Sequence, residues 1–388
     1  MDRSTSVGIC GTGFIARGFA MLAERQHEHV NWSVQRVLTR RAIASCTGFP
    51  YPHLLTNSLD QFIDECAVVV ECSGDVIHAT RVVDAALRAG RIVITMNAEF
   101  HATTGSYFVG RGVLTEAHGD QPGALAALAE DARAMGFAPL VYGNRKGYYH
   151  PDPPRDQMEY WTRKQGMSLE QVVAATDGTK IHIEQALVAN GLGASIAQDG
   201  MLGPTVETLV EGGQILGAHA KRLGRPIADY VIAPRAPAGV FVVAEHDPRQ
   251  QPYLSYFKLG EGPFYTLVQN YHLCHLEIGR TIDRMLAGGR PLLDNSPRPR
   301  IGVAAVAKRD LEIGYTIHRG IGGFDVRGEA VEIARHPHHA PVGLLADAVV
   351  RRRISAGDYV EIDDVDIPDT LAFSAWREIS AKSAATEA

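Results

Sequence analysis

The amino-acid sequence predicts an α/β protein with three parts, of which the first is a doubly wound parallel sheet. Short apolar runs alternate with amphipathic helical patterns through residues 1–150. The alternation stops at the proline-rich stretch 151–154, and a second stretch rich in proline and arginine, 290–300, precedes further strand patterns. We therefore expect a doubly wound domain, an α+β domain, an all-β domain and a frayed tail, over residues 1–150, 151–297, 298–379 and 380–388.

The composition is typical of a globular protein and argues against several kinds of partner. Of the 388 residues, 45% are hydrophobic and 21% are charged. A net charge of −6 without a basic block makes nucleic acid and anionic membranes poor partners. No apolar run approaches the roughly 20 residues that span a bilayer, and the first strand pattern begins too early for a signal peptide. We expect a cytoplasmic protein.

Cysteine and histidine usage does not predict a metal site. The five cysteines form no C-x-x-C pair and no disulfide framework, so we expect them to be reduced and structural. His272 and His275 are spaced for one helix face, but Glu277 falls on another face. Without a third well-spaced ligand, a histidine that contacts substrate or lies in the core is the better interpretation.

The first predicted strand, which includes Val7 and Ile9, runs into a Gly-x-Gly-x-x-Ala turn and then into an apolar helix. Gly11 permits the tight turn, and Gly13 lets the backbone approach a pyrophosphate without a Cβ in the way. The N–H groups of the next helix then face the phosphates. Strand, turn and helix together predict a Rossmann dinucleotide site, with Phe14 and Ile15 in its first helical turn.

The end of the second predicted strand, 31–38, indicates which cofactor is bound. Where NAD-binding folds place an acidic residue against the ribose hydroxyls, this chain has Thr39, Arg40 and Arg41. Arginine can pair with a 2′-phosphate, so these three residues are a predicted phosphate clamp. We therefore expect NADP(H) rather than NAD(H). The alternative is that the arginines are solvated charges.

Two further strands place polar residues at the same sheet edge. Strand 67–71 ends in Cys72-Ser73-Gly74, and strand 91–96 ends in Asn97 and Glu99. Ligands of open parallel sheets bind at the carboxyl ends of the strands. We expect Cys72, Ser73, Gly74 and Asn97 to contact the cofactor. Because asparagine is common in turns, the alternative for Asn97 is a simple turn residue.

Later segments add cationic candidates. Strand 137–142 leads into a loop with Arg145 and Lys146, which is either a site or an exposed basic loop. Lys180 opens helix 179–190, where a cation opposes the helix dipole unless an anionic ligand faces it. Other expected elements are helices and strands, over 58–65, 78–90, 124–135, 168–175 and 205–216 and over 238–244, 263–268, 301–307, 314–317 and 359–362.

Several of these motifs together resemble one family, the homoserine dehydrogenase-like proteins with a C-terminal SAF (β-clip) domain. The resemblance covers nearly the whole chain and rests on these segments: 11–13, 96–99, 119–122, 177–180, 262–265, 271–277 and 307–311. The family includes deoxyxylulose phosphate reductoisomerase-like enzymes, which form methylerythritol phosphate with NADPH. The loop here, Asn144-Arg145-Lys146-Gly147, departs from the family's loop, which is richer in lysine and glycine. This departure points to another substrate.

The expected chemistry is hydride transfer between a nicotinamide and a small polar, anionic substrate. Lys146 or Lys180 would stabilise the developing alkoxide and return a proton, with Glu99 and Asp120 orienting the lysines as part of the catalytic group. The expected substrate-binding residues are Arg145, His272 and Asp177. The alternatives are a reductoisomerase and a non-catalytic sugar- or redox-sensing protein. A homodimer is the default assembly.

Overall fold

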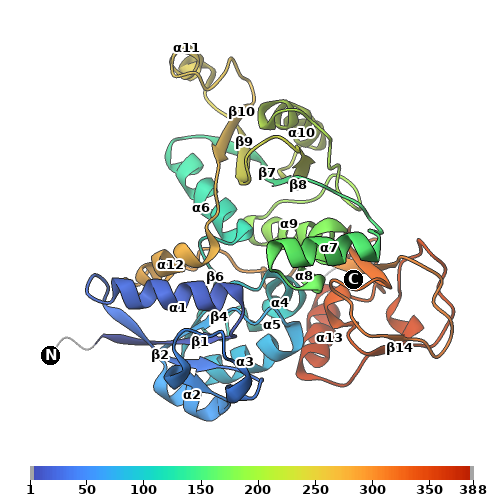
Figure 1. Ribbon diagram of the computed structural model, residues 1–388. Helices are drawn as coiled ribbons and strands as arrows, with labels where there is room; N and C mark the ends of the chain where they lie inside the picture. The colour runs from blue at the N-terminus through green and yellow to red at the C-terminus, as the bar shows by residue number, and fades with distance from the viewer. Residues whose placement is uncertain (1–3, 385–388) are drawn as a thin grey trace.

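The N-terminal part of the chain is a six-stranded parallel sheet with strand order β3-β2-β1-β4-β5-β6 (Figure 1). The computed structural model describes residues 4–384. The strands of this sheet are β1 (Thr5–Cys10), β2 (Trp32–Leu38), β3 (Leu55–Thr56), β4 (Val68–Glu71), β5 (Ile92–Thr95) and β6 (Leu114–Glu116). The predicted doubly wound α/β fold is confirmed for this part of the chain.

Helices cover both faces of this sheet. One face packs against α1 (Phe14–Gln26) and α12 (Ile278–Leu286), the other against α2 (Leu59–Glu65) and α3 (Val76–Arg88). The α12 helix returns from far along the chain, and the Trp32 indole nitrogen donates to Asp283 Oδ1 at 2.9 Å. Residues near 278–286, expected in the α+β domain, therefore pack on the first sheet.

The second sheet has the strand order β10-β9-β7-β8 and forms the upper part of the molecule in Figure 1. Its strands are β7 (Ala138–Lys146), β8 (Ile227–Ile232), β9 (Val240–Glu245) and β10 (Tyr265–Gln269). β7 pairs in parallel with β8, up to Lys146 opposite Ile232. The assignment of residues up to 150 to the first domain is therefore wrong for β7, and Arg145 and Lys146 lie on a strand rather than in a loop.

Helices also cover both faces of the second sheet. One face packs on α10 (Leu209–Leu223), and the other on α6 (Gln121–Ala134) and α9 (Thr179–Leu192). The structure contains α7 (Arg155–Gln165), which the sequence pattern did not predict, before α8 (Leu169–Thr176). In the second half, the short helix α11 (Gln251–Tyr256) lies between β9 and β10. In the first half, α4 (Ala98–Phe100), a π-helical turn (His101–Gly105) and α5 (Ser106–Phe108) connect β5 to β6.

The C-terminal part contains two small antiparallel sheets. One pairs β11 (Ile301–Ala307) with β13 (Val326–Glu332), and the other has the order β12-β14-β15. The short strands are β12 (Thr316–Ile317), β14 (Ala348–Val350) and β15 (Val365–Asp366). Two near-repeated phrases, 307–314 and 350–357, pair with each other, since Leu311 and Ile354 exchange two backbone hydrogen bonds of 2.8 and 3.0 Å.

The last element among the described residues is α13 (Leu371–Ala384), which lies against α3 in Figure 1. Ala372 and Trp376 pack there with Val76. The expectation of an all-β domain up to 379 and a frayed tail from 380 is therefore wrong as far as residue 384. The rest of the predicted tail, 385–388, lies outside the described residues. Within residues 4–384, no helix has the length and apolar character needed to span a bilayer.

Candidate active site

The turn between β1 and α1 has the geometry that a pyrophosphate requires. Gly11 has φ +113°, and a Cβ there would lie 2.9 Å from the carbonyl oxygen of Cys72. A Cβ on Gly13 would meet no atom within 4 Å, so this position opens onto free space. No side chain caps the N-terminus of α1, which leaves its first N–H groups available to a phosphate. The residues present fit a dinucleotide.

The two arginines after β2 lie beside this turn. Arg41 donates to Thr12 Oγ1 at 2.7 Å, and its own backbone N–H donates to Thr39 Oγ1 at 3.2 Å. Arg40 instead pairs with Asp75 at 2.8 Å, and its side chain is 59% exposed. The Asp75 carboxylate also caps α3. The predicted clamp residues thus border the cofactor turn, with Arg40 already partnered by a carboxylate.

A buried carboxyl group lies under the remaining cofactor-facing residues. Glu71 ends β4 and accepts a hydrogen bond of 2.8 Å from the N–H of Ser73. Burial raises the pKa of Glu71 to about 7. Asn97, at the end of β5, is buried and caps α4 by accepting from the N–H of Phe100 at 3.0 Å. Gly74 has φ +66°. The Glu71 carboxyl, which the sequence analysis did not single out, supports the edge formed by residues 72–74.

The segment before α12 lies over the start of α1 rather than in the substrate cavity. The His275 ring contacts that of Phe14, with centroids 6.0 Å apart, and a Cβ on Gly18 would lie 2.5 Å from the His275 ring. His272 Nδ1 is 3.9 Å from Cys274 Sγ and does not line the cavity described next. Among residues 4–384, no histidine, cysteine or carboxylate group has an arrangement that could hold a metal ion.

Both lysines singled out from the sequence line one cavity of about 530 Å³. It lies where α9, the end of β7 and the start of α6 meet, with α7 along one side. Its polar lining comes from Gln121, Asn144, Arg145, Lys146, Gln157, Gln165, Thr176, Lys180 and Glu184, and its apolar lining includes Met158, Trp161 and Val172. The structure therefore brings together two lysines, Lys146 and Lys180, that are 34 positions apart in the sequence.

Lys180 connects this cavity to the edge of the first sheet. Its Nζ lies 3.2 Å from Glu184 Oε1 and 3.8 Å from Glu99 Oε1, and its side chain is 33% exposed. Burial alone would lower the pKa of Lys180, but the carboxylates of Glu99 and Glu184 raise it well above its usual range. Lys180 is therefore a permanent cation near neutral pH.

Lys146 lies on the same cavity but has a different electrostatic state. It is 8% exposed, and its Nζ donates to the carbonyl oxygen of Ala175. Burial lowers the pKa of Lys146 to about 8, with Lys180 acting in the same direction and Glu184 and Asp177 against it. Lys146 can therefore lose or gain a proton near neutral pH, whereas Lys180 cannot.

Glu184 is the main site residue that the sequence analysis missed. It accepts from Asn144 Nδ2 at 3.0 Å and is 1% exposed. The Gln121 amide faces Glu184 and Asp120, and the hydrogen bonding requires that its nitrogen rather than its oxygen points to these acids, at 3.2 Å from Glu184 Oε1 and 3.0 Å from Asp120 Oδ1. Burial raises the pKa of Glu184 to about 7, against the effect of Lys180. Its spacing of four residues from Lys180 on a predicted helix was the available signal.

Asp120 belongs to a chain of buried acids behind Lys180. Burial, the charge of Asp120 and a hydrogen bond with it raise the pKa of Glu116 well above its usual range. On its other side, Glu116 Oε2 lies 2.5 Å from His101 Nδ1, and both side chains are fully buried. Burial lowers the pKa of His101 to about 3, so this ring is neutral. The raised pKa favours the protonated form of the Glu116 carboxyl.

Two predicted substrate-binding residues have other partners. Arg145 lines the cavity but donates to the carbonyl oxygens of Ala233 and Pro234 at 2.8 and 2.9 Å. Asp177 is fully buried and pairs with Lys308 at 2.7 Å. The expectation that Asp177 contacts substrate is therefore wrong, because Lys308 and the N–H of Thr179 occupy its carboxylate oxygens.

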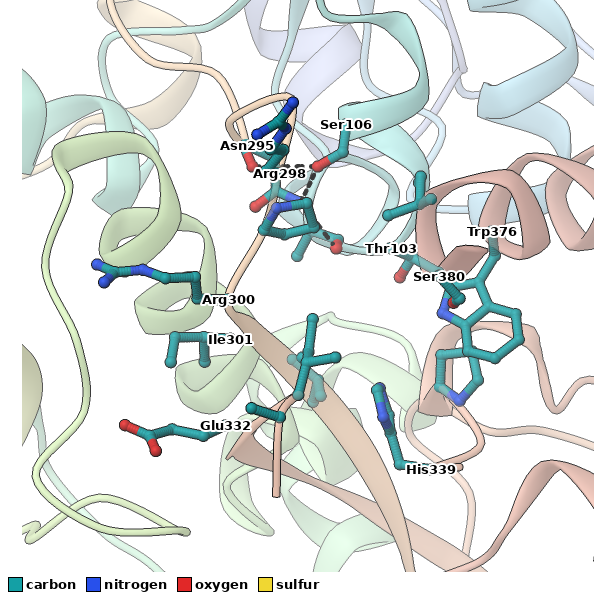
Figure 2. Close-up of a pocket in the computed structure, with 18 of the residues that line it drawn as sticks. Thr103, Ser106, Asn295, Arg298, Arg300, Ile301, Glu332, His339, Trp376 and Ser380 are labelled. Atoms are coloured by element: carbon teal, nitrogen blue, oxygen red, sulfur yellow. Dashed lines mark hydrogen bonds between the residues drawn. The ribbon is translucent and has the colours of Figure 1, made fainter. Parts of the chain in front are cut away.

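A second cavity, of about 550 Å³, is lined by other residues (Figure 2). Residues near 102–106 of the first domain, the stretch 295–300, the start of β11, the end of β13 and α13 form its walls. Figure 2 shows Asn295 hydrogen-bonded to Ser106, with Trp376 and His339 across the cavity. It contains neither Lys146 nor Lys180, so the cavity with the lysines is the candidate active site.

Two family models match the chain. Residues 11–108 match the NAD binding domain of homoserine dehydrogenase, and residues 119–278 match the catalytic domain of oxidoreductase DRL. The first match contains the glycine turn, and the second contains Asp120, Lys146, Lys180 and Glu184. No curated protein matches the chain.

Solved structures share this architecture only distantly. A homoserine dehydrogenase from Thiobacillus denitrificans has a TM-score of 0.47 at 14% identity, with 91% of this chain and 97% of that chain covered. The UDP-N-acetylglucosamine 3-dehydrogenase GnnA from Acidithiobacillus ferrooxidans has a TM-score of 0.41 at 12% identity, with 75% and 91% covered. Likeness at this level carries no information on substrate. The two domain matches, on a fold with an intact dinucleotide turn, show that the chain is an NAD(P)-dependent oxidoreductase.

Proposed function

We propose that the chain transfers a hydride between NADP(H) and the carbonyl or hydroxyl carbon of a small, polar, anionic substrate. The observation that carries this proposal is the cavity in which Lys146 and Lys180 meet beside the carboxyl edge of the first sheet. Two ammonium groups and few free carboxylates favour an anionic substrate, since Glu99 and Glu184 are both engaged by Lys180.

The residues that would hold the dinucleotide lie along the edge of the first sheet. Gly11, Gly13, Phe14 and Ile15 would bind the pyrophosphate, and Cys72, Ser73, Gly74 and Asn97 would border the nicotinamide half. When bound, the nicotinamide supplies or accepts the hydride. The chain's own groups then act on the substrate oxygen.

The two lysines would divide the remaining work. Lys180 stays cationic and stabilises negative charge that develops on the substrate oxygen. Lys146, with a pKa of about 8, donates a proton to that oxygen during reduction and accepts it during oxidation. Glu99 and Glu184 orient Lys180, and Asp120 orients Gln121 and through it Glu184.

The preference for NADP(H) is part of the proposal and has its own test. Arg40 and Arg41 border the turn where a 2′-phosphate would lie, and no acidic residue ends β2. In fluorescence titrations we expect NADPH to bind more than tenfold tighter than NADH, since a charge-assisted contact is worth about 1.5–3 kcal/mol. Arg41→Gln should weaken NADPH and leave NADH unchanged. Equal binding of the two coenzymes to the wild-type chain would contradict the preference.

The reaction itself is tested by following NADPH oxidation with phosphorylated ketoses and small aldehydes. Turnover that is lost in Lys146→Met and Lys180→Met, with NADPH binding retained, supports the assignment. If both variants keep full turnover, the lysines are not the catalytic groups. Control substrates without an acidic group should react far more slowly if the cavity selects anions.

One observation favours a second candidate, a reductoisomerase that rearranges the carbon skeleton before hydride transfer. Simple hydride transfer needs one proton-transfer group, whereas this cavity holds two: Lys146, with a pKa of about 8, and Glu184, with a pKa of about 7. Proton removal and return at different atoms would use both. Product analysis by NMR distinguishes the candidates, because only a rearrangement changes carbon connectivity.

Expectations on the C-terminal unit, location, assembly and partners accompany the proposed reaction. We propose that the C-terminal sheets form a SAF-type unit, supported by the pairing of the repeats 307–314 and 350–357. We propose a cytoplasmic homo-oligomer, by default a dimer, without a nucleic-acid or membrane partner. Light scattering of the purified chain tests the assembly.

A further inference from the structure

The C-terminal unit reaches the active site through one buried ion pair. Lys308 follows β11, and its Nζ lies 2.7 Å from Asp177 Oδ2 and 2.8 Å from the carbonyl oxygen of Gly323. The two side chains of the pair are 1% and 0% exposed. A buried pair of this kind is costly to break from one side, because the remaining charge keeps no partner.

Asp177 in turn fixes the start of α9. Its Oδ1 accepts the N–H of Thr179 at 2.9 Å, across Gly178, which has φ +92°. Lys180 is the next residue along the chain, in the first turn of α9. Two residues before Asp177, the carbonyl oxygen of Ala175 accepts from Lys146 Nζ. The segment 175–180 therefore contacts or carries both lysines of the cavity.

Strand β13 of the same C-terminal unit holds the first turns of α9 at two more points. The N–H of Gly328 donates to Thr179 Oγ1 at 2.8 Å, and the N–H of Ala330 donates to His182 Nδ1 at 3.3 Å. Strand β13 and the ion pair thus both contact the start of α9. This arrangement gives the C-terminal unit, which has no polar group in the cavity, a structural route to it.

We propose that Lys308 is a positioning residue through which the C-terminal unit sets the segment 175–180, and with it the amines of Lys146 and Lys180. The proposal rests on the proposed function only in treating these lysines as catalytic. The charged groups that face Lys146 are Glu184, Asp177 and Lys180. Lys308 acts through Asp177 and does not touch the substrate cavity.

The test measures the reactivity of each lysine amine directly and needs no substrate. Trace acetylation with acetic anhydride, quantified by peptide mass spectrometry across pH, measures the neutral fraction and accessibility of each lysine amine. In Asp177→Asn, Lys146 loses a nearby anion, so its labelling midpoint should fall and its labelling at a fixed lower pH should become faster. Because Lys308 acts through Asp177, an unchanged midpoint together with an unchanged labelling rate would overturn the proposal.

The double variant Lys308→Met with Asp177→Asn separates positioning from stability. Removing both charges should restore much of the melting temperature lost in Lys308→Met, because neither charge is left alone. If Lys308 positions the segment, the limiting labelling rate of Lys146 above its midpoint, where the amine is neutral with or without the Asp177 charge, stays at least about threefold faster than in wild type, through local opening. If this limiting rate returns to wild type together with the melting temperature, the pair only stabilises the fold and the proposal is wrong.

The matched control is Arg335→Met. Arg335 also links the C-terminal unit to the preceding domain, through Asp199 at 2.8 Å, but does not contact segment 175–180. Its labelling profile should equal that of wild type, and a change like that of the double variant would count against a specific route. Absence of NADPH oxidation with every substrate would contradict the proposed function and leave these labelling results intact.

Discussion

At the scale of single residues, the two cavity lysines differ because their surroundings differ. Lys146 is nearly closed off from solvent, and its Nζ donates to the carbonyl oxygen of Ala175. Within residues 4–384 it forms no ion pair, so burial dominates its pKa. Lys180 lies between two carboxylates, so attraction dominates. The proposed function therefore assigns the same type of side chain the role of proton donor in one position and of fixed cation in the other.

This difference predicts the alkaline side of the pH profile. A lysine that must be protonated to donate is active below its pKa, so the rate of carbonyl reduction should fall as pH rises through about 8. Lys146→Met should lower kcat by about 10²–10⁴-fold and remove this limb. Lys221→Met, at the exposed end of α10, is the control and should change neither. A limb near pH 8 that persists in Lys146→Met would assign it to another group.

Glu184 predicts the acidic side. Its carboxyl has a pKa raised to about 7, so it becomes anionic as pH rises through that value. If the anion is needed to hold Lys180, the rate should rise through pH 7 and this limb should vanish in Glu184→Gln, which keeps the shape of the side chain. Loss of the anion also lowers the pKa of Lys180. Profiles of kcat for both proteins decide the point, and identical acidic limbs would contradict the role.

At the scale of elements, the strand–turn–helix at the N-terminus separates binding from folding. Gly11 has φ +113° and no room for a Cβ, whereas Gly13 faces open space. Gly11→Ala should destabilise the fold by about 1–2 kcal/mol. Gly13→Ala should fold with unchanged melting temperature and weaken NADPH binding at least about tenfold, since its methyl group occupies the space of the pyrophosphate. Tight NADPH binding by Gly13→Ala would exclude this turn as the phosphate site.

Elements with a local signal were predictable, and those defined by distant partners were not. The helix near 179–190 and strand 301–307 follow from their own residues, and the structure contains α9 and β11 there. The pattern of β7 is that of a buried strand in either sheet, so only its pairing with β8 and β9 places it in the second one. For the same reason Lys146 looked like a loop residue.

The site shows the same limit at the level of partners. The spacing of Lys180 and Glu184 can be read from a helix, but the pairing of Asp177 with Lys308 joins positions 131 residues apart. No periodic pattern of residues in the sequence indicates a contact over this separation. In the sequence, a polar residue at a helix start has the same pattern whether a substrate or a buried lysine faces it. For this reason the sequence predicts, wrongly, that Asp177 contacts substrate.

At the scale of the whole molecule, one hydrophobic core joins the second sheet to the C-terminal unit. Leu187 of α9, Val242 of β9, and Val303 and Val326 of the C-terminal sheet belong to the same buried cluster. The core of the first sheet, around Val70 and Ile94, is separate. Parts that share a core lose it together, whereas parts with their own cores can unfold independently.

This division predicts the unfolding behaviour. In calorimetry the second domain and the C-terminal unit should melt in one transition, and NADPH should raise the melting temperature of a transition that contains the first domain, since ligand stabilises the part that binds it. Cutting the chain after residue 297 should expose the β11-facing side of α9 and leave the remaining piece aggregation-prone rather than active. If the fragment 1–297 stays monomeric, with an unchanged melting temperature and unchanged Lys146 labelling, the shared core is dispensable. The C-terminal unit would then have no structural means of acting on the lysines.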